Sequence, residues 1–264
     1  MVVQSSPIDF NRVQDAFSSA HDRYVTAEPF PHASFTDLFD LDVLRQIEAE
    51  FPRPTEMGGS FTGEIEGGKF TESEFAHFGP TTQAFVAAAN SGTFCALLSE
   101  LTGIQGLISD PYLAGGGLHQ TATGGRLKVH SDFNVHPTLN LTRQLNMLVY
   151  LNEDWDEAWG GRLELWNKDM TKAEVAFTPH IGNVAIFTCS DISFHGLPDP
   201  LTCPPDRFRR SIAFYYFTAD AATPEPRSTL WKERPGEDFM SRPSARFKRA
   251  GGHAYRAAKS LFER

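Results

Sequence analysis

The chain has 264 residues, and its content of 41% hydrophobic and 22% charged residues is typical of a globular protein that buries a substantial core. A formal net charge of −9 argues against a general binder of nucleic-acid phosphates. The first twenty residues lack the pattern of a secretory signal, no apolar run reaches the ~18 residues that span a bilayer, and the three cysteines show no CxxC spacing. We therefore expect a cytoplasmic protein with reduced thiols and no membrane partner.

Residues 1–104 are predicted to form a helical support region. A weak helical pattern covers residues 13–20, and residues 29–35 resemble a short strand. Asp37 is placed to cap a helix that ends before Pro52 and carries an apolar face of Leu38, Leu41, Leu44 and Ile47.

The second half of this region has two segments, a glycine-rich one and one with a strong helical pattern. Residues 54–79 are rich in glycine and polar side chains, so we expect a long loop that is either a lid or a surface insertion. Apolar residues at helical spacing predict a helix or helix pair over residues 81–101, and Gly103 is placed to end it.

From residue 105 to 220 the pattern changes to short β-rich runs separated by turn residues. The predicted strands are residues 112–113, 127–133, 145–151, 162–166, 174–177, 184–188 and 210–217. Strands of this length predict a sandwich or barrel of jelly-roll type. Because helices precede a β core, the predicted fold class is α+β. We expect the helices to pack against one sheet and the whole chain to form one compact domain.

Residues 221–264 form a predicted C-terminal extension. It is polar and proline-rich at first, and residues 245–264 are basic and helix-prone. We expect that helix to pack on the core or on a partner subunit, which leaves a homodimer open; a nucleic-acid patch is the less favoured alternative.

The residues with the clearest chemistry are His130, Asp132 and His195. His130 and Asp132 are two apart in a predicted strand and would project from one face of it. A third ligand from a distant strand, His195, would complete the facial triad of two histidines and one carboxylate that binds iron in non-haem oxygenases.

Two further strands carry residues suited to the same cavity. Arg209 and Ser211 would face the same way, and a guanidinium with a hydroxyl is a good clamp for a carboxylate. Asn146 and Tyr150 share a face of residues 145–151 and could line the same cavity.

The ordered motifs His130-x-Asp132, His195 and Arg209-x-Ser211 resemble the signature of the Fe(II)/2-oxoglutarate-dependent dioxygenases, specifically the prolyl-4-hydroxylase-like branch. The similarity covers residues 105–218 well and residues 28–52 loosely. It implies a double-stranded β-helix core with the metal at one open end of the barrel.

The resemblance also implies a cofactor set and residue roles. His130, Asp132 and His195 would bind Fe(II), and Arg209 would pair with the distal carboxylate of 2-oxoglutarate, supported by Ser211 and Tyr150. We place Asn146 with them among the residues that bind the cosubstrate. Dioxygen would be the second cosubstrate, and no catalytic residue is expected beyond the metal ligands. Many members carry a tyrosine about ten residues before the first metal histidine; this chain has Gln120 there, which we assign to the cosubstrate in its place.

The expected reaction is hydroxylation of an unactivated C–H bond, by analogy a prolyl or other amino-acid residue in a peptide, a protein or free form. Candidate substrate contacts are Asn134, His119 and Arg126, while Arg143 either receives an anionic substrate or is an ordinary exposed arginine. His136 precedes a proline, so we interpret it as a surface histidine. The alternative functions are a cupin-like binding or isomerase jelly roll and a non-catalytic barrel that serves as an interaction module.

Overall fold

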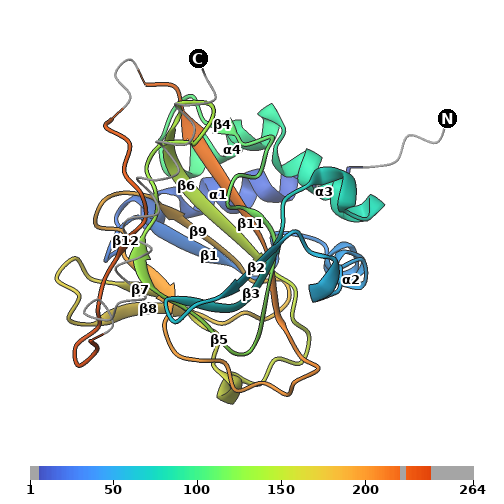
Figure 1. Cartoon of the computed structure of the whole chain (residues 1–264). Helices are drawn as coiled ribbons and strands as arrows, with labels where there is room; N and C mark the ends of the chain where they lie inside the picture. The colour runs from blue at the N-terminus through green and yellow to red at the C-terminus, as the bar shows by residue number, and fades with distance from the viewer. Residues whose placement is uncertain (1–5, 221–223, 239–264) are drawn as a thin grey trace, which may run out of the picture.

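The computed structural model describes residues 6–220 and 224–238. Within these residues, antiparallel strands curve into a nearly closed barrel with helices along its outer side (Figure 1). The helices are α1 (Phe10–Val25), α2 (Leu41–Ala49), α3 (Pro80–Ala89) and α4 (Gly92–Thr102). The first strands are β1 (His32–Phe35), β2 (Gly59–Thr62), β3 (Glu66–Glu72), β4 (Ile108–Ser109), β5 (Gly117–Ser131) and β6 (Thr142–Tyr150). The remaining strands are β7 (Leu163–Trp166), β8 (Ala173–Phe177), β9 (Val184–Thr188), β10 (His195–Leu197), β11 (Arg209–Thr218) and β12 (Leu230–Trp231).

Strand β5 connects the two parts of the sheet. The strands follow the order β1-β9-β6-β11-β5-β10-β7-β8, and β3 and β12 also pair with β5. The first half of β5 pairs with β11, and its second half pairs with β10 and β12. The chain approaches itself closely at Gly125, where a Cβ would lie 2.4 Å from Thr121 Cγ2 and 2.7 Å from the Ala122 carbonyl oxygen. Glycine is therefore required between the two halves.

Strand β11 separates the hydrophobic core from the barrel interior. Phe214 and Tyr216 are fully buried in the core cluster that joins the sheet to the helices. Their rings lie 6.3 Å from those of Phe85 in α3 and Phe94 in α4, respectively. Side chains alternate across a strand. The intervening residues of β11, which include Arg209, therefore face a cavity inside the barrel. The predicted jelly-roll core with buttressing helices is confirmed.

Several helix predictions are confirmed, with different boundaries. The region 81–101 is a pair, α3 and α4, and the left-handed backbone of Gly103 (φ 75°) ends α4 as expected. The N-terminal helix is longer than the predicted 13–20. The cap of α2 is Asp40 rather than Asp37, because Leu38 and Phe39 are buried ahead of the helix. No single helix in the part of the chain described has both the length and the apolar composition to cross a membrane.

The prediction of a long loop over residues 54–79 is wrong. Strands β2 and β3 form a hairpin there, and β3 pairs with β5 (Figure 1). Two of its glycines are needed for close contact: a Cβ would lie 2.2 Å from Thr71 Oγ1 at Gly59 and 2.4 Å from the Gly63 carbonyl oxygen at Gly67. The glycine content that resembles a loop thus permits close packing of a hairpin.

Three other predictions need comment. Residues 112–113 form a turn, in which Leu113 has φ 47°, and the strand is instead β4. Strand β5 begins ten residues before the predicted 127–133 and ends at Ser131. The predicted basic helix at residues 245–264 lies outside the described residues.

Candidate active site

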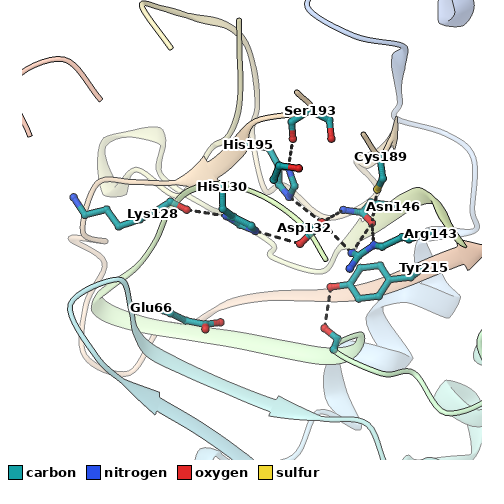
Figure 2. Close-up of polar contacts among 12 residues, drawn as sticks. Glu66, Lys128, His130, Asp132, Arg143, Asn146, Cys189, Ser193, His195 and Tyr215 are labelled. Carbon is teal, nitrogen blue, oxygen red and sulfur yellow. Dashed lines mark hydrogen bonds and ion pairs between the residues drawn. The ribbon is translucent and has the colours of Figure 1, made fainter. Parts of the chain in front are cut away.

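The three predicted metal ligands lie together at one end of the barrel. His130 is in β5, His195 begins β10, and the two residues are register partners in the antiparallel pair. Their Nε2 atoms lie 3.3 Å from Oδ1 and Oδ2 of Asp132, respectively (Figure 2). One ligand atom from each residue lies within 4.8 Å of the other two. The spacing fits a single metal ion.

Asp132 reaches this position by a route that differs from the prediction. It lies one residue beyond β5, not on the strand with His130. Strand alternation therefore does not place the two side chains together. The chain leaves the sheet at Ser131, and the Asp132 carboxylate meets both imidazoles from there.

Backbone carbonyl groups orient both histidines. His130 Nδ1 lies 2.8 Å from the Lys128 carbonyl oxygen, and His195 Nδ1 lies 2.9 Å from that of Ser193. A carbonyl only accepts hydrogen bonds, so each Nδ1 carries the proton and each Nε2 keeps its lone pair toward Asp132. This is the arrangement in which imidazole binds a metal ion.

The charge states also suit a divalent cation. Burial alone would raise the pKa of Asp132, but the charge of Arg143 beside it holds that pKa well below its usual range. Burial lowers the pKa of His195. The site therefore presents an anionic carboxylate and a neutral imidazole at neutral pH.

Asn146 and Arg143 hold the Asp132 carboxylate from behind. Asn146 Nδ2 donates to Asp132 Oδ2 over 2.8 Å, and Arg143 Nη2 lies 3.0 Å from the same oxygen. Arg143 also donates from Nε and Nη2 to Asn146 Oδ1, over 3.0 and 2.7 Å. Asn146 contacts the predicted metal ligand and also lines the cavity, so its binding to the cosubstrate stays a prediction. Arg143 is 3% exposed, which contradicts the reading of an ordinary surface arginine.

Arg209 occupies the predicted position inside the barrel. Its Nε donates to the Gly161 carbonyl oxygen over 2.7 Å, and its Nη2 lies 3.3 Å from the Tyr150 hydroxyl. Ser211 lines the same cavity, whereas Arg210 faces outward and pairs with Glu48, as strand alternation predicts. Arg209, Tyr150 and Ser211 thus form the group that the sequence anticipated.

Gln120 does not face the cavity, so its assignment to the cosubstrate is wrong. Its Nε2 donates to the Pro52 carbonyl oxygen over 2.9 Å, on the outer side of β5. Its neighbours His119 and Thr121 project from the other face of the strand and line the cavity. His119 Nε2 is buried and has no hydrogen-bond partner in the part of the chain that the structure describes. Burial, followed by the charge of Lys69, holds the His119 pKa well below its usual value.

The other predicted substrate residues have mixed outcomes. Arg126 lines the cavity and donates from Nε to the Glu64 carbonyl oxygen. Asn134 hydrogen bonds with the backbone of Glu225 and Arg227, so it ties the C-terminal segment to the barrel and does not line the cavity. His136 is buried, with its Nε2 3.1 Å from Asp110, which contradicts its interpretation as a surface histidine.

The cavity has a volume of about 420 Å³ and includes residues that the sequence did not reveal. Lys69 comes from β3, opposite Thr121 of β5, which in turn lies opposite Arg209 of β11. Trp231 comes from β12, and its ring lies 4.9 Å from that of His130. Both belong to segments outside the motif-bearing region. An isolated tryptophan in a polar, proline-rich stretch was the available signal for the second.

Comparison with known proteins gives one family match and many structural ones. Residues 116–217 match the 2OG-Fe(II) oxygenase superfamily. A prolyl-4-hydroxylase from Pseudomonas putida has 18% identity and a TM-score of 0.54, covering 77% of this chain and all of its own. The structure of prolyl 4-hydroxylases from Phytophthora capsici has 18% sequence identity and a TM-score of 0.56. The match covers 85% of this chain and 70% of that one.

A third similar structure contains a peptide fragment. The prolyl hydroxylase of Trichoplax adhaerens, in complex with a hypoxia inducible factor peptide fragment, has 15% identity and a TM-score of 0.54, covering 77% of this chain and 90% of its own. A search among curated proteins finds no match. At these identities the structural likeness is one of fold.

Proposed function

We propose that the protein is a member of the 2OG-Fe(II) oxygenase superfamily, whose model matches residues 116–217, and that it uses Fe(II), 2-oxoglutarate and dioxygen to hydroxylate an unactivated C–H bond. The observation that carries the proposal is one cavity that contains both a two-histidine, one-carboxylate cluster and a buried arginine. A cupin-like binding or isomerase function is less well supported, because it gives no role to Arg209 and Ser211.

The residues present fit the metal. His130, Asp132 and His195 would hold Fe(II), with two oriented Nε2 lone pairs and one anionic carboxylate. When bound, Fe(II) would supply the activation of dioxygen that couples oxidative decarboxylation of 2-oxoglutarate, to succinate and CO2, with hydroxylation of the substrate. Trp231 lines the same cavity, with its ring beside that of His130.

Arg209 would bind the carboxylate of 2-oxoglutarate that lies farther from the metal. Its Nε is fixed by Gly161 and its guanidinium lies against the Tyr150 ring, 4.9 Å from the ring centroid. The Ser211 hydroxyl on the same face can donate a second hydrogen bond. A buried, charge-assisted contact of this kind both neutralises and orients a carboxylate.

The substrate class follows by analogy with the fold. Proteins of similar structure are named prolyl hydroxylases, and one is described with a peptide. A prolyl or other amino-acid residue is therefore our proposal for this chain. All three cysteines are free, which agrees with a reducing compartment such as the cytoplasm.

Release of succinate from 2-oxoglutarate, measured with and without Fe(II), tests the proposed function. We expect release that requires Fe(II) and that rises with a hydroxylatable substrate. Arg209→Ala should raise the KM for 2-oxoglutarate by about 10- to 100-fold, since a charge-assisted hydrogen bond contributes about 1.5–3 kcal/mol. Arg210→Ala is the matched control, because Arg210 faces outward on the same strand. Equal KM values for both variants would remove Arg209 from the proposed site.

A further inference from the structure

Arg143 and Arg209 occupy different ends of the same cavity. Along β11 the residues that face inward include Arg209, Ser211, Ala213 and Tyr215. The guanidinium carbon of Arg143 lies 3.5 Å from the centroid of the Tyr215 ring and 4.5 Å from that of Phe133. Tyr215 lies six positions beyond Arg209 along the strand, a span of roughly 20 Å. Arg143 is therefore beside the predicted metal ligands (Figure 2). It is remote from the site proposed for the far carboxylate of 2-oxoglutarate.

The Arg143 guanidinium has one group with no role in the network around Asp132. Its Nε and Nη2 bind Asn146 and Asp132, whereas Nη1 is buried and has no hydrogen-bond partner among residues 6–220 and 224–238. A buried donor without a partner is costly, and its presence in a residue that lines a cavity indicates that a ligand supplies the acceptor. The ring of Tyr215 fixes the guanidinium plane, and the Tyr215 hydroxyl is itself held by the Gly115 carbonyl oxygen over 2.8 Å.

The charges around the cavity point to the same kind of ligand. Four cationic side chains line it, Lys69, Arg126, Arg143 and Arg209, against two carboxylates, Glu66 and Asp132. The lining therefore carries an excess of two positive charges. Fe(II) and the dianion 2-oxoglutarate cancel each other, so this excess remains when both are bound. A low-dielectric cavity with an uncompensated positive charge favours an anion.

We propose that the substrate carries a carboxylate and that Arg143 Nη1 receives it beside Phe133 and Tyr215. The inference rests on the proposed function and narrows its substrate class. The preferred substrate is a free amino acid or a residue at a C-terminal end, in place of a residue within a chain. Arg143 then has two roles: Nη2 holds the metal-binding carboxylate, and Nη1 holds the substrate next to it.

The test uses the full protein with Mn(II) in place of iron, which allows binding without turnover, and saturating 2-oxoglutarate. The probes are L-proline with L-prolinamide and glycyl-L-proline with its amide, so each pair differs only in the carboxylate. The readout is relaxation of probe protons by the bound metal in NMR spectra. We expect each acid to be relaxed at least fivefold more than its amide. A preference for the acid seen only with L-proline indicates a free amino acid as the source of the carboxylate. A preference seen only with glycyl-L-proline indicates a C-terminal chain end.

Variants assign the effect to Arg143. Arg143→Gln should remove the difference between acid and amide, Arg143→Lys should restore part of it, and the exposed Arg162→Gln should leave it unchanged. Equal relaxation of acids and amides in the wild type would overturn the inference even if Arg143→Gln loses the metal. Survival of the acid preference in a metal-loaded Arg143→Gln protein would also overturn it. Relaxation of 2-oxoglutarate itself is recorded first, since its absence would refute the proposed function and not this inference alone.

Discussion

Asn146 joins Asp132 to Arg143: its Nδ2 donates to Asp132 Oδ2 over 2.8 Å, and its Oδ1 accepts from Arg143 Nη2 over 2.7 Å. Cys189 Sγ lies 3.2 Å from the same Asn146 oxygen. Because both ends of the amide are engaged, its orientation is fixed. The amide in turn fixes which carboxylate oxygen of Asp132 remains available to a metal ion.

Asn146→Ala should therefore weaken Fe(II) binding by about 10- to 100-fold, the usual effect of removing a group that orients a metal ligand. Iron affinity is measured anaerobically by titration. Gln144→Ala is the matched control, because Gln144 lies two residues away on β6 and donates to Thr218 outside the site. Equal iron affinity in the two variants would show that the Asp132 carboxylate does not depend on the Asn146 amide.

The buried histidines make stability depend on pH in a defined direction. Burial, followed by the charge of Lys69, holds the pKa of His119 well below 6.5, and burial lowers that of His195. The folded protein keeps these groups neutral at pH values where the unfolded chain binds protons. Their contribution to stability is thus fully present above about pH 6.5 and is lost as the pH falls below that value.

Urea unfolding of the metal-free protein at pH 7.5, 6.5 and 5.5 measures this dependence. Each such histidine contributes a slope of up to about 1.4 kcal/mol per pH unit below the unfolded pKa. His119→Asn should reduce the slope by removing one of the two groups. A slope that is unchanged in this variant would mean that His119 is protonated in the folded state.

Gly125 determines whether the two halves of β5 can both join the barrel. A Cβ there would lie 2.4 Å from Thr121 Cγ2 and 2.7 Å from the Ala122 carbonyl oxygen. Gly125→Ala should destabilise the protein by about 1–3 kcal/mol, the typical cost of overpacking. Gly92→Ala, in α4 with no atom within 4 Å of its Cβ, is the control and should be neutral or slightly stabilising. Chemical denaturation measures both, and equal stability would contradict the close approach.

The sequence was sufficient for the chemistry that depends on residue type and order. His130, Asp132 and His195 are identified by ligand chemistry, and Arg209 and Ser211 by strand alternation, because β11 is a regular strand. Where the strand boundary was misplaced the same rule failed. Asp132 is off the strand, although its predicted proximity to His130 is still found in the structure.

Other features depend on contacts that local sequence does not encode. Gln120 and His119 are adjacent, and which of them faces the cavity depends on the register of β5 against β11. The hairpin at β2 and β3 is stabilised by pairing with β5, which overrides a composition typical of a loop. Trp231 reaches the site because β12 pairs with β5 at His130, a contact about a hundred residues apart in the chain.

Metal stoichiometry tests the central claim most directly, namely that three side chains hold one ion. Anaerobic titration of the wild-type chain with Fe(II) should give one tightly bound ion. The double variant His130→Ala, Asp132→Ala should bind none, while circular dichroism shows the same fold. One tightly bound ion in that folded double variant would contradict the account.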